Sequence, residues 1–309
     1  MSTLFKSIYP ILEACMNQGS TVELGIAVYN AGAYPSLCSW TYLGDYQKMR
    51  DDLDSLVLAT GSSKVHLSFG LHEILKNSKI CYSMIEDYKI PTVEVVYEEL
   101  DDGPANIDEL VVTALKPISD MGTKIFKRIR YPVSAEIKKK HLLDGFCIKG
   151  MESAGKVTNE YTVKELFLLQ QSLTPDAFLI PYGGVGSPEQ VKEYIDMGAE
   201  IVAVGTVLAY CQESPVKLEA KRAVIETKKN NITTFKVNRP GTKDFSMVQN
   251  VIKFDTYKGK DDLNHTNSVI AGMYDTNTTQ GHLFVGHGIE HVTKILPCSQ
   301  IIKHLISHL

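Results

Sequence analysis

The chain has 309 residues, a formal net charge of −4 at pH 7 and a hydrophobic content of 44%, a composition typical of a globular protein with a sizeable core. This balance of charge gives no overall attraction to nucleic acid or to an anionic membrane, so we expect neither as a partner. The sequence shows no leader in which a basic segment is followed by an apolar one, and no window of eighteen apolar residues. We therefore expect a cytoplasmic protein without a membrane span.

The cysteines and histidines give no sign of a metal centre or a disulfide framework. The six cysteines are scattered, without a C-x-x-C pair, and the H-E-x-x-H motif does not occur. Because metal and disulfide sites in sequence depend on clustered spacings, we predict reduced thiols and no metal site.

Short apolar runs alternate with longer amphipathic segments, the pattern of repeated β-α units around a parallel sheet. Several runs are apolar at nearly every position, as expected for strands covered on both faces. Their number predicts a TIM (β/α)8 barrel, and the first βα turn lacks the G-x-G-x-x-G pattern of a dinucleotide-binding open sheet. The predicted strands comprise residues 9–14, 34–38, 65–69, 92–97, 124–129, 145–149, 177–181 and 201–204.

The pattern changes after the eighth predicted strand. Residues 215–227 predict a helix, whereas residues 230–280 are polar with weak periodicity. A structureless loop of that length is uncommon in a compact domain. We therefore predict that residues 1–214 and 281–309 form the barrel and that residues 215–280 form an inserted cap or helical subdomain.

Two glycine-containing turns follow the seventh and eighth predicted strands. The first contains Gly183 and Gly184, with Ser187 as an N-cap and Pro188 in the first turn of the next helix; the second contains Gly205 and Thr206. Glycines before a helix let backbone N–H groups approach an anion, and barrels often hold a phosphate after strands 7 and 8. Glycines also simply make tight turns, but two such turns in consecutive units favour a phosphate site.

Three stretches carry a family pattern: residues 9–16 with 27–33, residues 149–156, and residues 183–214. Together they resemble the nitronate monooxygenase family and its relatives, the flavin-dependent enoyl-acyl-carrier-protein reductases. The resemblance covers most of the chain outside residues 215–280 and implies a barrel that binds FMN. The FMN-binding positions that it implies are Met16, His66, Lys149, Gly155, Gly183, Gly184, Ala203, Val204, Gly205 and Thr206.

The glycines match the family pattern, but three side chains depart from it. His66 stands where the family has Asn, Lys149 where it has Gln, and Lys156 where it has the catalytic His that takes a proton α to a nitro group. A lysine of ordinary pKa is a poor base at neutral pH, so Lys156 can serve only if burial or a neighbouring cation lowers its pKa. Alternatively, both lysines stabilise reduced flavin or bind an anionic ligand.

The residues leave three functions open. We expect an FMN-dependent oxidoreductase acting on a small activated substrate, with Lys156 and His66 as candidate catalytic residues. The first alternative is an NAD(P)H-dependent enoyl-thioester reductase. The second is a catalytically divergent barrel that binds a flavin or a phosphate ligand. A homo-oligomer is compatible with each.

Overall fold

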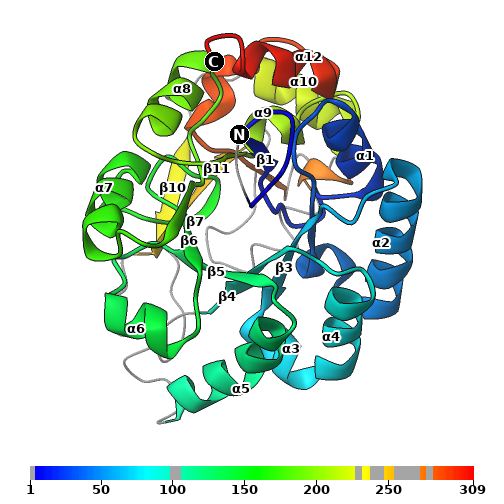
Figure 1. Cartoon of the computed structure of the whole chain (residues 1–309). Helices are drawn as coiled ribbons and strands as arrows, with labels where there is room; N and C mark the ends of the chain where they lie inside the picture. The colour runs from blue at the N-terminus through cyan, green and yellow to red at the C-terminus, as the bar shows by residue number, and fades with distance from the viewer. Residues whose placement is uncertain (1–3, 98–105, 227–231, 237–246, 254–271, 276–280) are drawn as a thin grey trace.

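The computed structural model describes residues 4–97, 106–226, 232–236, 247–253, 272–275 and 281–309. Its centre is a ring of parallel strands surrounded by helices (Figure 1). Each of these strands overlaps one that the sequence predicts. The ring consists of β1 (Ile11–Glu13), β2 (Ser36–Cys38), β3 (His66–Gly70), β4 (Thr92–Val96), β5 (Lys124–Ile129), β6 (Gly145–Ile148), β8 (Phe178–Pro181) and β9 (Val202–Val204).

The strand pairings pass all the way round the ring. One six-stranded sheet has the order β2-β3-β4-β5-β6-β8, and β1 pairs with β9, all in parallel. Two isolated parallel bridges, Leu12 to Tyr34 and Tyr182 to Ala203, join these two sheets. The pairings therefore return to β1, and the predicted (β/α)8-barrel class is confirmed.

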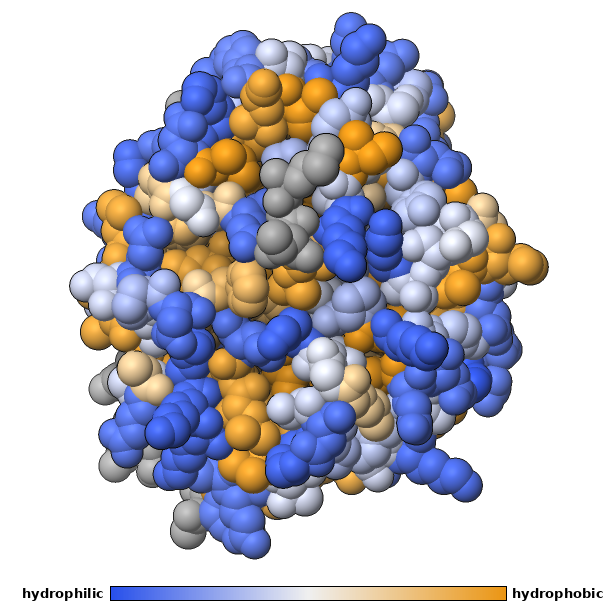
Figure 2. Space-filling model, in the orientation of Figure 1, coloured by the Kyte–Doolittle hydropathy of each residue, from blue (hydrophilic) through white to orange (hydrophobic). Residues whose placement is uncertain are grey.

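Helices cover the outside of the ring (Figure 1). Several begin at a side-chain cap; Ser187 accepts from the Gln190 N–H and Pro188 opens α8, as the sequence predicts. On the face that Figure 2 shows, hydrophilic residues are spread over the whole view with apolar residues between them. The helices are α1 (Val22–Asn30), α2 (Tyr46–Thr60), α3 (Leu71–Lys76), α4 (Ser78–Asp87), α5 (Ile107–Asp120), α6 (Ala135–Lys140), α7 (Val163–Leu173), α8 (Pro188–Asp196), α9 (Thr206–Ala209), α10 (Leu218–Glu226) and α12 (Cys298–Leu305), with 3-10 turns η1 (Ser39–Tyr42) and η3 (His287–His291).

The core has two parts because strand side chains alternate between the two faces of the ring. A large apolar cluster fills the space between strands and helices, and a smaller one lies inside the ring. Phe5 fills the N-terminal end of the interior, where its ring lies 5.1 Å from that of Tyr34 and 5.8 Å from that of Phe126. The opposite end of the barrel is left for polar side chains.

A second, antiparallel sheet is attached to the barrel. Its strands are β7 (Gly155–Thr158), β10 (Thr233–Lys236), β11 (Met247–Lys253) and β12 (His282–Phe284), and β11 pairs with each of the other three. The predicted insertion, residues 215–280, thus contributes α10 and two strands, while its residues 227–231, 237–246, 254–271 and 276–280 lie outside the described residues. The division into barrel and insertion stays a prediction. Nowhere in the described part does a helix combine the length and apolarity needed to cross a membrane.

Candidate active site

A cavity of about 510 Å³ lies at the C-terminal ends of the barrel strands. Its lining includes Met16 after β1, Gly70 at the end of β3, Arg130 after β5 and Lys149 after β6. Residues of the second sheet, among them Lys156 on β7, complete it. In barrels of this class the site lies at this face, because the βα loops converge there.

The two predicted glycine turns meet at this cavity, where Gly183, Gly184, Gly205 and Thr206 all line the wall. Gly183 and Gly184 have φ values of +143° and +76°, which favour glycine. A Cβ on Gly183 would lie 1.9 Å from Ser153 Oγ, and one on Gly184 would lie 2.8 Å from Glu152 Cβ. The first turn therefore requires two glycines and presents bare backbone to the cavity.

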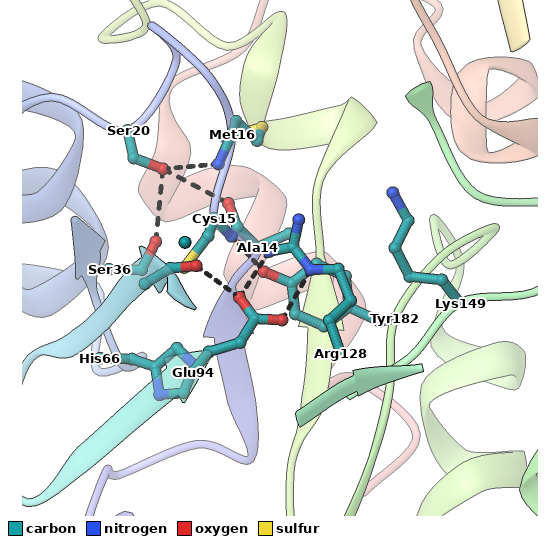
Figure 3. Close-up of polar contacts among 12 residues, drawn as sticks. Ala14, Cys15, Met16, Ser20, Ser36, His66, Glu94, Arg128, Lys149 and Tyr182 are labelled. Carbon is teal, nitrogen blue, oxygen red and sulfur yellow. Dashed lines mark hydrogen bonds and ion pairs between the residues drawn. The ribbon is translucent and has the colours of Figure 1, made fainter. Parts of the chain in front are cut away.

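A buried ion pair lies inside the barrel mouth, between Glu94 on β4 and Arg128 on β5 (Figure 3). Arg128 Nε donates to Glu94 Oε1 over 2.7 Å, Arg128 Nη2 donates to Oε2, and Ser68 Oγ donates to Oε2 over 2.9 Å. Burial alone would raise the pKa of Glu94, but the Arg128 guanidinium lowers it to about 2. Glu94 is therefore an anion, and its charge is matched by that of Arg128.

Aromatic rings hold the Arg128 guanidinium in place. It lies 5.5 Å from the Trp40 ring centroid and 5.3 Å from that of Tyr182, distances at which cation–π attraction operates. The Tyr182 hydroxyl in turn accepts a hydrogen bond from the backbone N–H of Cys15. Arg128, Trp40, Tyr182 and Cys15 all line the cavity, so this assembly forms part of its wall.

Lys149 and Lys156, the two lysines that depart from the family pattern, both line the cavity. Lys149 is buried, and its ammonium donates to the carbonyl of Ala154 over 2.8 Å. Burial, assisted by the positive charges of Arg128, Arg130 and Lys156, lowers the pKa of Lys149 well below its usual 10.5. The surroundings thus lower the pKa of Lys149, a residue to which the family resemblance assigns flavin binding and not proton transfer.

His66 lies away from the cavity. It starts β3, its Nδ1 lies 2.9 Å from Thr92 Oγ1, and its ring packs against those of Phe5 and Phe126. Burial lowers its pKa to about 4, so the ring is neutral. The lining residues of this strand are instead Gly70 and, beyond it, Leu71 and His72.

Of the other predicted positions, some line the cavity and some do not. Met16 and Gly155 line the cavity, whereas Ala203 and Val204 are buried within β9, one step below the lining. Met16, Lys149, Gly155, Lys156 and the glycine turns are therefore the predicted residues that the fold brings together.

Sequence reasoning missed Glu94, Arg128, Arg130 and Trp40. A signal was present, because Glu94 interrupts an apolar strand, and Arg128 near the end of the next strand is followed two residues later by Arg130. One further group has no such signal: ligand atoms of Cys15, His66 and Glu94 lie within 4.8 Å of one another. Both Glu94 oxygens already accept hydrogen bonds from Arg128, so this group has a cationic partner, and the absence of a metal stays a prediction.

The fold and site define a (β/α)8-barrel protein with a glycine-walled cavity at the C-terminal ends of its strands. The nitronate monooxygenase family model matches residues 119–308, more than half of the chain. The chain belongs to the nitronate monooxygenase family, a family of oxidoreductases. A search of curated proteins found no match.

Solved structures share the fold at low sequence identity. FabK from Thermotoga maritima aligns with a TM-score of 0.76 and 18% identity over 99% of this chain and 94% of its own. A nitroalkane oxidase from Streptomyces ansochromogenes aligns with a TM-score of 0.69 and 15% identity over 98% and 96%. The enoyl reductase domain of MlnA from Bacillus amyloliquefaciens aligns with a TM-score of 0.69 and 9% identity over 98% of this chain and 94% of its own. At these low identities, the TM-scores show a shared fold and nothing further.

Proposed function

We propose that the protein is an FMN-dependent oxidoreductase acting on a small activated substrate. The observation that carries this proposal is the meeting of two glycine turns, after β8 and β9, on one cavity at the barrel mouth. When bound, FMN supplies the electron transfer, while the protein supplies binding, orientation and electrostatics.

The residues present fit a flavin phosphate. Gly183 and Gly184 line the cavity without side chains, so an anion can approach the backbone N–H groups there. Thr206 Oγ1 accepts from the Gly286 N–H over 2.9 Å, which leaves the hydroxyl hydrogen to donate to an anion. We assign the phosphate to Gly183, Gly184, Gly205 and Thr206.

The rest of the cavity would hold the ring system and the substrate. Met16 and Gly155 line it, and we assign both to the flavin. The Lys156 side chain lines the same cavity, and its positive charge beside a bound flavin would favour the reduced, anionic form. Because burial lowers its pKa, Lys149 can accept a proton at Nζ, a role that the sequence assigns to Lys156.

The reaction is tested by two assays on FMN-loaded protein. Oxygen-dependent consumption of a nitronate would establish the first function. Oxidation of NAD(P)H coupled to reduction of an enoyl thioester, without nitronate turnover, would replace it with the enoyl-thioester reductase. FMN binding with neither turnover would leave a flavin-binding barrel and contradict the oxidoreductase proposal for these substrates.

A further inference from the structure

The turn between β1 and α1 forms one side of the cavity, and its lining residues are Ala14, Cys15, Met16, Asn17 and Gly19. These residues belong to no helix or strand, so their backbone groups need hydrogen-bond partners of other kinds. Part of this need is met within the turn, because the N–H groups of Gly19 and of the next residue both donate to the Met16 carbonyl over 3.0 Å. Other backbone groups of the turn rely on side chains.

The Ser20 hydroxyl binds the middle of this turn (Figure 3). Ser20 is fully buried, and its Oγ accepts a hydrogen bond from the Met16 N–H over 3.0 Å. The same Oγ lies 3.4 Å from the Ala14 carbonyl oxygen, to which it can donate its one hydrogen. One hydroxyl therefore ties together the backbone on both sides of Cys15.

The barrel wall holds Ser20 from behind. Its Oγ lies 3.3 Å from the Oγ of Ser36, the first residue of β2. The Ser36 N–H donates to Oε2 of Glu13 on β1 over 3.2 Å, and all three side chains are buried. Because β1 and β2 belong to the closed ring, the Ser20 hydroxyl is a fixed point to which the turn is attached.

The Met16 N–H depends on this hydroxyl, whereas the far half of the turn is held separately. The Gln18 N–H donates to Oγ1 of Thr41 over 3.1 Å. An amide N–H that loses its partner away from water is costly. Without the Ser20 hydroxyl, the Met16 N–H would have to find another partner, and the backbone at Met16 would lose its fixed position.

The position of Met16 matters because its side chain reaches the second glycine turn. A Cβ on Gly205 would lie 3.9 Å from Met16 Sδ and 3.4 Å from Ala14 Cβ, so the thioether lies beside Gly205. Met16 and Gly205 both line the cavity. A shift of the Met16 backbone would therefore move the thioether within the wall of the proposed flavin site.

We propose that Ser20 is a positioning residue for flavin binding, which fixes the Met16 backbone and so holds the Met16 side chain in the cavity wall. This inference rests on the proposed function and deepens it. The family resemblance assigns Met16 to the flavin and says nothing of Ser20. Ser20 is not among the described residues that line the cavity, so it acts on the flavin through Met16.

Ser20→Ala removes the hydroxyl and little else. It should weaken FMN binding about tenfold in fluorescence titrations and shift the absorbance bands of the bound flavin. In flavin-free protein, hydrogen exchange in the peptide of residues 14–20 should become faster. The matched control is Thr123→Val, which removes another buried hydroxyl, one that donates to the Ile90 carbonyl over 2.7 Å just before β5; it should change none of these three measurements.

A double-mutant cycle tests whether Ser20 acts through Met16. Met16→Ala should weaken FMN binding by removing the thioether. Adding Ser20→Ala to it should weaken binding by less than about twofold more, because the side chain that Ser20 positions is already gone. Losses that add in full would overturn the inference.

Circular dichroism shows whether each variant is folded. If Ser20→Ala does not fold, Ser36→Ala withdraws the support of the hydroxyl from the barrel wall and should weaken FMN binding about threefold. Unchanged FMN affinity and absorbance in the folded variant would overturn the inference and leave the proposed function in place. Failure of the original protein to take up FMN would overturn the proposed function, and the positioning role with it.

Discussion

Replacing Glu94 by Gln removes the negative member of the buried pair while keeping its shape. Glu94 is fully buried and the Arg128 side chain is 11% exposed, so solvent screens the interaction little. Gln would leave the guanidinium without a counter-charge among Trp40, Tyr182 and the barrel interior. Breaking a buried pair in this way costs about 3–5 kcal/mol, a large share of the roughly 5–15 kcal/mol that stabilises a typical domain.

Urea unfolding followed by circular dichroism measures this loss. Asp196→Asn, which breaks the exposed pair with Lys192, is the control and should cost at most about 1 kcal/mol. Glu94→Gln with Arg128→Met should lose less than the sum of the single variants, because no charge is left buried. A Glu94→Gln protein as stable as the Asp196→Asn control would refute this account of the ion pair.

The pH dependence of the same experiment has a defined sign. The pKa of Glu94 is depressed from 4.5 to about 2 in the folded protein. Its stabilising contribution is therefore present above pH 4.5 and is lost as the pH falls toward 2. The difference in stability between the original protein and Glu94→Gln should shrink over that range, and a constant difference would contradict the assignment.

Three other residues give separate predictions. Burial raises the pKa of Glu13 from 4.5 to about 8, so stability should be full below pH 4.5 and fall by about 1.4 kcal/mol per pH unit up to pH 8. Glu13→Gln should flatten the dependence of stability on pH, as measured by urea unfolding. An unchanged dependence would contradict the raised pKa of Glu13. Gly183→Ala places a Cβ 1.9 Å from Ser153 Oγ and should weaken FMN binding at least tenfold by fluorescence titration; Gly122→Ala, at a glycine with open space around it and positive φ, controls for backbone strain. Lys156→Ala should lower turnover while Lys156→His retains it, if Lys156 moves a proton; equal rates for all three proteins would exclude that role.

The barrel and the glycine turns were predictable because both depend on short, local stretches of sequence. Apolar runs define strands, and glycines define a turn whose backbone no other residue can adopt. The Glu94–Arg128 pair was not predictable, since it depends on two strands lying in register, which places side chains 34 residues apart in contact. The presence of the charged Glu94 within an apolar strand indicates that it has a partner, but it does not identify Arg128 as that partner.

The sequence also did not predict which end of its strand a residue occupies. Alternation indicates that His66 faces the barrel interior, but it does not say at which end of the strand the site lies. Because β3 runs from His66 to Gly70, His66 begins the strand and the cavity lies at its far end. Likewise β7, which carries Lys156, exists through its pairing with β11 about 90 residues later in the chain, and nothing in its own four residues indicates a strand.

The FMN content of the purified protein tests the central claim most directly. We predict a yellow protein with flavin absorbance bands that releases about one FMN per chain on denaturation, or a colourless protein that takes up one FMN when it is added. In Gly183→Ala that uptake should be weakened at least tenfold, while in Gly122→Ala it should persist. A folded, colourless protein that binds no added FMN would contradict the assignment of the glycine-walled cavity.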